Sequence, residues 1–161
     1  MEKGIILIID PEAHTQWILK TLLENEGYEV LTANTIASAR KKISRIGLAG
    51  LITEYWVDHL STIGIIRKFK KLYPEAYVMM LTNGEMQEKE YQKIIDAGVD
   101  DYFLKPFSSQ KILLHLHKGL KHHQILSKNK KSLEEIWRNF TGKGGFRAID
   151  EDQVIGGGIP K

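Results

Sequence analysis

Two segments of the chain read VMMLTNGE, at Val78–Glu85, and AGVDDYFLKPF, at Ala97–Phe107. A short apolar run of strand length overlaps each segment, one over Ala76–Thr82 and one over Asp100–Leu104. Apolar residues at helical spacing lie between the two runs, and this helical segment closes on a glycine, Gly98. A strand, a helix and a second strand in this order predict a parallel pair of strands joined by a right-handed helical crossover.

The same pattern occurs in the first half of the chain. Three further apolar runs of strand length lie at Gly4–Asp10, Tyr28–Ala33 and Leu48–Glu54, and each is followed by a segment with helical spacing. Several of the runs are almost continuously apolar, which is typical of strands covered on both faces of a sheet. The sequence therefore predicts an α/β fold, a doubly wound parallel sheet of five strands.

Composition limits the classes of protein that this chain can represent. Its 161 residues, 42% hydrophobic and 27% charged, are enough for one domain with a full core. The chain has no cysteine, which excludes disulfides, thiolate metal sites and cysteine nucleophiles. The first apolar run is shorter than a signal-peptide core, and no run of about 18 apolar residues occurs. We therefore expect a cytoplasmic protein without a membrane span.

Polar side chains stand where four of the five predicted strands end: Asp10, Glu54, Thr82 and Lys105. In parallel sheets the carboxyl ends of the strands meet at one edge, where ligands bind. A pair of carboxylates, a hydroxyl and an ammonium group at one edge are what recognition of a phosphoryl group and its cation would use.

At these residues the sequence resembles the receiver domains of two-component response regulators, over roughly Lys3 to Lys121. The resemblance implies a flavodoxin-like (CheY-like) sheet with strand order 2-1-3-4-5. It also implies that Thr82 and Lys105 belong to the phosphate pocket and that Tyr102 is the aromatic switch residue. Sensor kinases or other signalling proteins are the partners that such a domain would have.

Two positions depart from the family pattern. Glu54 stands where the family has the aspartate that is phosphorylated, and Pro11 stands where it has the second of two adjacent acids, the direct magnesium ligand. Glutamate carries its carboxylate roughly 1.5 Å further from the backbone, and phosphoryl transfer depends mainly on positioning. We therefore expect no bound metal. The only candidate ligands for magnesium are Asp10, Glu12 and Glu54, and Glu12 would have to replace the acid that is missing at position 11.

Other interpretations of the same residues stay open. Asp10, Pro11 and Glu12 also suit a helix start, with Asp10 as the N-cap, Pro11 at the first position and Glu12 in the first turn. Asp58 could replace Glu54 as phosphoacceptor, although we favour an ordinary loop acid. Four histidines near the last helix point in different directions and do not suggest a metal cluster; they are His115, His117, His122 and His123.

The predicted receiver domain covers residues 1–121, and residues 122–161 form a helical extension with a flexible Gly-rich tail. Leu133, Ile136, Trp137 and Phe140 make an apolar stripe at helical spacing, which predicts a separate helix over Lys128–Phe140 and self-association into a homodimer. The segment from Thr141 holds six of the 14 glycines. Lysines gather after Gly119, but the net charge of only +3 gives little reason to expect nucleic-acid binding.

The functional expectation is a pseudo-receiver: a signalling module, not an enzyme, that acts by protein–protein binding without normal aspartyl phosphorylation. The surface formed by the fourth helix, the fifth strand and the fifth helix would bind a partner. The alternative is a phosphorylatable receiver, with a magnesium-dependent phosphoacceptor at Glu54 or Asp58.

Overall fold

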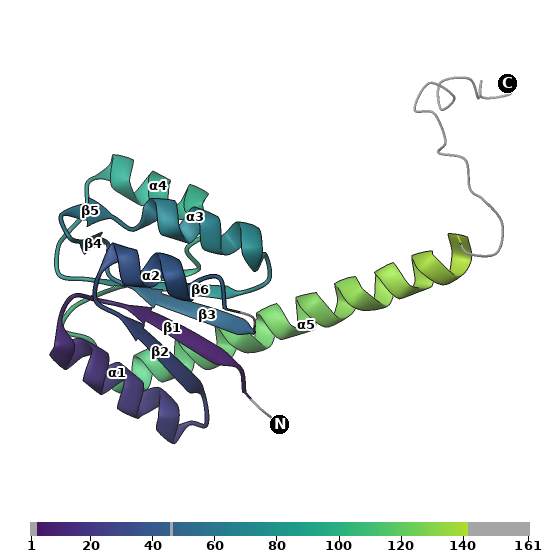
Figure 1. Ribbon diagram of the computed structural model, residues 1–161, viewed down its shortest axis with the longest axis horizontal. Coiled ribbons are helices and arrows are strands. Elements are labelled where there is room, and N and C mark those ends of the chain that lie inside the picture. The colour runs from purple at the N-terminus through teal and green to yellow at the C-terminus, as the bar shows by residue number, and fades with distance from the viewer. Residues whose placement is uncertain (1–2, 46, 142–161) are drawn as a thin grey trace, which may run out of the picture. The chain divides into compact units, whose positions relative to one another are not determined.

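The computed structural model of the protein describes residues 3–45 and 47–141 (Figure 1). Five parallel strands form one sheet: β1 (Ile5–Ile9), β2 (Glu29–Ala33), β3 (Leu48–Thr53), β6 (Tyr77–Thr82) and β7 (Asp101–Leu104). They lie in the order β2-β1-β3-β6-β7, which is the predicted order 2-1-3-4-5 of the main-sheet strands. The first and last residues of each strand lie within one residue of the ends of the predicted apolar run.

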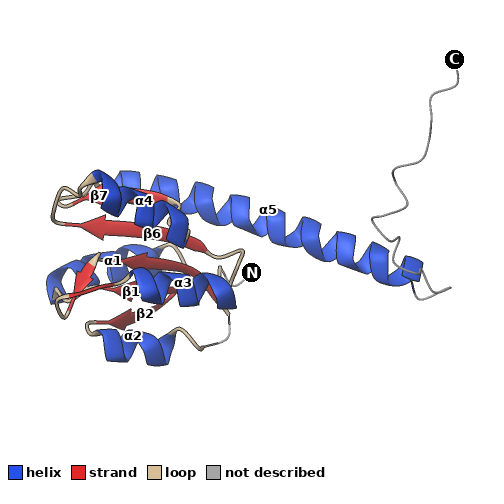
Figure 2. Cartoon of the chain, turned by 90° about the horizontal axis from the view of Figure 1, so that it is seen from above, coloured by secondary structure: helices blue, strands red, loops and turns tan. Residues whose placement is uncertain are grey.

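Helices cover both faces of the sheet, as Figures 1 and 2 show. One face packs against α2 (Ile36–Lys42), α3 (Ile63–Leu72) and α4 (Glu88–Ala97). The other packs against α1 (Ala13–Asn25) and the first part of α5 (Ser109–Thr141), from which Ile112, Leu116 and Leu120 are buried. Ile6–Ile9 of β1 and Leu51 and Ile52 of β3 are almost completely buried, which explains why these strands read as continuous apolar runs.

A small hairpin between β3 and α3 was not predicted. It pairs β4 (Trp56–Val57) with β5 (Leu60–Ser61) in antiparallel fashion. Its turn residues, Asp58 and His59, both have positive φ angles, of 53° and 59°. The Asp58 carboxylate accepts a hydrogen bond of 2.9 Å from the amide of Ile36, at the start of α2. This contact supports the interpretation of Asp58 as a loop acid.

The beginning of α1 corrects one of the interpretations made from sequence. The helix begins at Ala13, its N-cap residue is Glu12, and its first turn has no acidic residue. Asp10 therefore does not cap the helix, and Pro11 is not its first residue. Instead, the Asp10 carboxylate accepts the amide hydrogen of Glu12 at 2.8 Å in a tight turn.

The last helix is also different from the prediction. α5 runs without interruption from Ser109 to Thr141, so the expected separate helix over Lys128–Phe140 is wrong, and the predicted boundary at residue 121 falls inside one helix. The chain nevertheless forms two compact units, which divide between Ser127 and Lys128. The side chain of Phe140 and the Gly-rich segment after Thr141 lie outside the described residues.

Candidate functional site

The strand register brings the predicted site residues together. Ile9 pairs with Thr53, so the next residues, Asp10 and Glu54, emerge side by side, and the amide of Glu54 bonds to the Ile9 carbonyl at 2.8 Å. On the other side of β3, the Lys105 amide bonds to the Thr82 carbonyl at 2.8 Å. All of these residues therefore lie at the carboxyl edge of the sheet, as the sequence predicted.

Lys105 lies at the centre of the site. Its ammonium nitrogen is 2.7 Å from Oδ2 of Asp10 and 3.0 Å from Oε2 of Glu54, and 3.8 Å from Oε2 of Glu12. The side chains of Lys105, Asp10 and Glu54 are almost completely buried, whereas that of Glu12 is half exposed. The shared sheet edge that the sequence predicted thus brings Glu54 and Lys105 into an ion pair.

Glu54 uses its two carboxylate oxygens differently. Oε1 turns back and accepts the amide hydrogen of Tyr55 at 2.7 Å. Oε2 faces Lys105 in a close ion pair that lacks hydrogen-bond geometry. The longer side chain of glutamate thus bends back toward the adjacent backbone, and it does not simply project further into the pocket.

Burial and the neighbouring charges have opposite effects on the pKa of each buried group at this site. Burial raises the pKa of Asp10 above its ordinary value, and the contacts with Lys105 and with the Glu12 amide oppose that shift only in part. Burial alone would lower the pKa of Lys105, but the neighbouring carboxylates of Asp10 and Glu54 outweigh it and raise that pKa. Lys105 therefore remains an ammonium ion, and its positive charge is shared among the acids.

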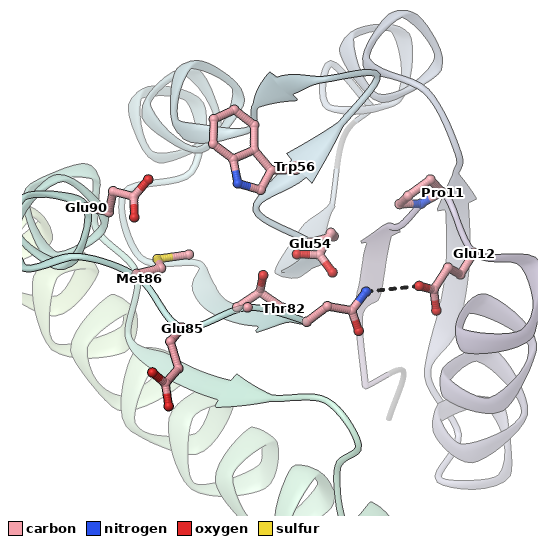
Figure 3. Close-up of a pocket in the computed structure, with 10 residues that line it drawn as sticks. Pro11, Glu12, Glu54, Trp56, Thr82, Glu85, Met86 and Glu90 are labelled. Carbon is pink, nitrogen blue, oxygen red and sulfur yellow. Dashed lines mark hydrogen bonds between the residues drawn. The ribbon is translucent and has the colours of Figure 1, made fainter.

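Glu12 is held from the loop after β6. Its Oε1 accepts a hydrogen bond of 3.0 Å from the side-chain amide of Asn83 (Figure 3). Its Oε2 accepts one of 3.0 Å from the Thr15 hydroxyl. These bonds, together with Lys105, lower the pKa of Glu12. The sequence named Glu12 as a candidate but contained no signal for its partners, because both contacts depend on loop geometry.

A pocket opens beside these groups, between β3, the loop after β6 and α4 (Figure 3). Glu54 and Thr82 form part of its wall, together with the acidic residues Glu85 and Glu90, which the sequence analysis did not single out. The complete lining is Pro11, Glu12, Glu54, Trp56, Thr82, Asn83, Gly84, Glu85, Met86 and Glu90.

Tyr102 lies beside the same loop. Its hydroxyl donates a hydrogen bond of 3.2 Å to the Gly84 carbonyl, and its ring packs edge-on against Tyr91 with centroids 5.4 Å apart. Partial burial, followed by the contact with Tyr91, raises the pKa of Tyr102 to about 12. Tyr102 therefore connects the wall of the pocket to α4.

The residues of the site do not fit a magnesium ion. The Lys105 ammonium already occupies the position between the carboxylates, both oxygens of Glu12 accept hydrogen bonds, and Pro11 has no oxygen in its side chain. Magnesium needs near-octahedral oxygen ligands. Over residues 3–45 and 47–141, no group of three or more His, Cys, Asp or Glu side chains is arranged to hold a metal.

The histidines of α5 lie apart from this site. His115 is 3.3 Å from Asp101, His117 is 3.5 Å from Glu26, and His123 is 3.2 Å from Asp100. The side chain of His123 is largely buried, and its ring packs against Tyr77. None of the described helices is long and apolar enough to cross a membrane.

Comparison with known proteins identifies the family to which this fold and this site belong. Residues 6–117 match the response regulator receiver domain family, and the chain belongs to that family. A receiver domain protein (CheY-like) from Methanospirillum hungatei JF-1 is similar in structure, with a TM-score of 0.70, 26% identity, and coverage of 74% of this chain and 95% of that one. A receiver domain from Clostridium thermocellum gives a TM-score of 0.68 at 26% identity, covering 76% and 98%.

Among curated relatives, the uncharacterized transcriptional regulatory protein YkoG of Bacillus subtilis (strain 168) is 26% identical over 121 residues, which is 75% of this chain and 53% of YkoG. The transcriptional regulatory protein SrrA of Staphylococcus aureus (strain NCTC 8325 / PS 47) is 26% identical over 111 residues, 69% of this chain and 45% of SrrA. The chain thus spans about half the length of the curated relatives it matches.

Proposed function

We propose that this receiver domain is a pseudo-receiver, which acts in the cytoplasm by binding other signalling proteins, without catalytic activity and without normal aspartyl phosphorylation. The observation that carries the proposal is the position of the Lys105 ammonium, 2.7 Å from Asp10 and 3.0 Å from Glu54. Part of the negative charge at the phosphoacceptor position is already neutralised from within the protein. The Tyr55 amide in addition holds Oε1 of Glu54, so neither oxygen is set to attack an incoming phosphoryl group.

The chemistry of the site supports this proposal in a second way. Phosphoryl transfer needs a cation that neutralises the charge on the transferred group, and it leaves the protein mainly the task of positioning. Pro11 and the engaged oxygens of Glu12 provide poor ligands for such a cation. We infer that the pocket works without magnesium.

A surface suited to protein binding supports the interaction role. Exposed apolar side chains lie on α4, β7 and the first part of α5, the elements through which the family resemblance implies partner contacts: Ile95 is 63% exposed, Leu104 43% and Leu114 51%. A sensor kinase or another signalling protein is the proposed partner. Charged substitutions at Ile95 and Leu114 should abolish partner binding, whereas Leu72→Asp, at a similarly exposed apolar position on α3, should not.

Intact-mass measurement tests the central claim. The full chain is incubated with acetyl phosphate and magnesium, beside a receiver domain with an intact phosphorylation site as positive control. The expected result is no phosphate adduct on this chain. A stoichiometric adduct would establish the competing function, a phosphorylatable receiver, and peptide mapping would then assign the phosphate to Glu54 or Asp58.

A further inference from the structure

The pocket beside Glu54 has an acidic wall. Glu12, Glu54, Glu85 and Glu90 line it, and its lining contains no Lys, Arg or His side chain (Figure 3). Like charges gathered around one opening repel one another, and a positive group placed among them would relieve that repulsion.

A second observation points to a ligand at the same place. Glu54 is 5% exposed and belongs to the pocket wall, yet its Oε2 accepts no hydrogen bond. The nearby Lys105 forms an ion pair with this oxygen from the protein side, without hydrogen-bond geometry. A buried carboxylate oxygen has room for a hydrogen-bond donor and is costly to leave without one. A group that enters the pocket can supply a hydrogen-bond donor to this oxygen beside the ion pair with Lys105.

Trp56 gives the pocket an aromatic wall. Its side chain is 52% exposed and forms part of the pocket lining. The ring is held in place by buried Tyr55, against which it packs edge-on with ring centroids 4.9 Å apart, and by its position in the β4–β5 hairpin. An exposed and anchored indole face is a favourable surface for a cation.

From these three observations we propose that the pocket binds a basic side chain, an arginine, presented by a partner protein. The guanidinium group would donate hydrogen bonds to the acidic wall and to Oε2 of Glu54, and it would stack on Trp56. Met86, at the same opening, would contact the aliphatic part of the arginine. This inference rests on the proposed function, since it names the kind of group that the interaction module recognises.

Arginine fits the site better than a metal ion does. A metal ion would have to compete with Lys105 for the oxygens of Asp10 and Glu54. A planar guanidinium needs acceptors at the mouth of the pocket together with an aromatic face, and the pocket offers both.

The test uses the full chain, labelled with nitrogen-15, and a nine-residue glycine-serine peptide with one central arginine. The matched control peptide carries citrulline, which has nearly the same shape but no charge. We expect saturable shifts of the Asn83 and Gly84 amides and of the Trp56 indole with the arginine peptide, and none with the citrulline peptide. Equal shifts with both peptides, or none with either, would overturn the proposal.

Matched variants locate the binding. Trp56→Ala should weaken arginine-peptide binding by roughly fivefold, and Glu85→Gln should weaken it as well. Glu88→Gln, a carboxylate of α4 outside the pocket lining, should leave the affinity unchanged. Thermal unfolding of each variant verifies the fold. Loss of binding in Glu88→Gln equal to that in Glu85→Gln would show a diffuse charge effect and would contradict a defined site.

Two further measurements separate the inference from the proposed function. Displacement of the peptide by millimolar magnesium, with shifts of the same amides, would mean that the pocket is a metal site and would overturn the inference. If the arginine peptide does not bind while the chain still gives no phosphate adduct and still captures its partner, only this inference fails. A phosphate adduct would instead contradict the proposed function.

Discussion

Lys105 is the cation on which the buried acids of the site depend. A buried charge is tolerated when it is paired, and the removal of one partner leaves the others uncompensated. At this site one ammonium group is paired with two buried carboxylates and contacts a third at the rim.

Substitution of Lys105→Met should therefore lower the free energy of unfolding by about 3–5 kcal/mol at neutral pH. Loss of Lys105 removes the contact that opposes the rise in the pKa of Asp10, so that pKa rises further in the folded state. A carboxyl group whose pKa is raised by folding destabilises the folded state at high pH. This destabilisation is lost as the pH falls below the pKa of the unfolded state, near 3.8 for Asp10. The stability deficit should consequently shrink as the pH falls from 7 toward 4.

Chemical denaturation across this pH range is the measurement. Lys20→Met, which removes an exposed pair with Glu24, serves as the control and should change stability by less than about 0.5 kcal/mol. A deficit of the same size at pH 4 and pH 7 would argue against an electrostatic origin.

Repair of the two departures from the family pattern tests whether they cause the proposed loss of phosphorylation. Glu54→Asp alone should shorten the acceptor but leave the cation poorly held, and Pro11→Asp alone should add a ligand without the correct acceptor. Only the double variant should give a substantial phosphate adduct by intact mass, because acceptor and cation act as one unit. A folded but inert double variant would show that another feature, such as Trp56 at the pocket wall, blocks the site.

At the scale of single elements, the packing of α5 on the sheet depends on one glycine. A Cβ atom at Gly119 would lie 2.2 Å from the ring of Tyr77. That ring is buried, and its hydroxyl donates a hydrogen bond to Asp101. The helix can approach the sheet this closely only because position 119 has no side chain.

Gly119→Ala should accordingly destabilise the domain by about 1–3 kcal/mol, even though alanine is the better helix former. Gly64 in α3 gives the matched control, since nothing lies within 4 Å of a Cβ at that position. Gly64→Ala should stabilise the domain by up to about 1 kcal/mol. The measurement is the thermal unfolding temperature of the two variants. A Gly119→Ala variant that is more stable than the original chain would mean that α5 can shift away from the sheet without cost.

The elements differ in how well the sequence predicted them. The five main strands follow from their apolar runs, and the ion pair of Glu54 with Lys105 follows from the shared edge of the sheet. The β4–β5 hairpin was missed because strands of two residues have no periodicity to detect. The start of α1 was misplaced because Asp10 has a helix-capping side chain but uses it on the Glu12 amide and on Lys105.

The interruption expected in α5 had no basis in helix-stop chemistry, because residues 120–127 contain no glycine or proline. The partners of Glu12 and the acids Glu85 and Glu90 could not be predicted, since they depend on how the loop after β6 folds over the strand ends. Single-sequence patterns carry little information about such loops.

For the whole molecule, the two compact units predict what truncation does. A chain that ends at Ser127 retains Ile112, Leu116 and Leu120, the α5 residues buried against the sheet, and should remain folded. In the second unit, Leu133 and Ile136 are largely exposed, and their burial in a homodimer is expected. Sedimentation equilibrium should then give about twice the monomer mass for the full chain and the monomer mass for the truncated one. Equal association states would contradict a role of the second unit in dimer formation.

The bond from Asp58 to the Ile36 amide has a consequence beyond the anchoring of a loop. It joins the hairpin that carries Trp56 to the first turn of α2, a helix on the layer opposite α1 and α5. A ligand that favours one position of the hairpin therefore changes the free energy of the α2 terminus as well. Because thermodynamic linkage is reciprocal, a protein that binds α2 would change the affinity for a ligand at Trp56 by the same factor by which that ligand changes the affinity for the protein.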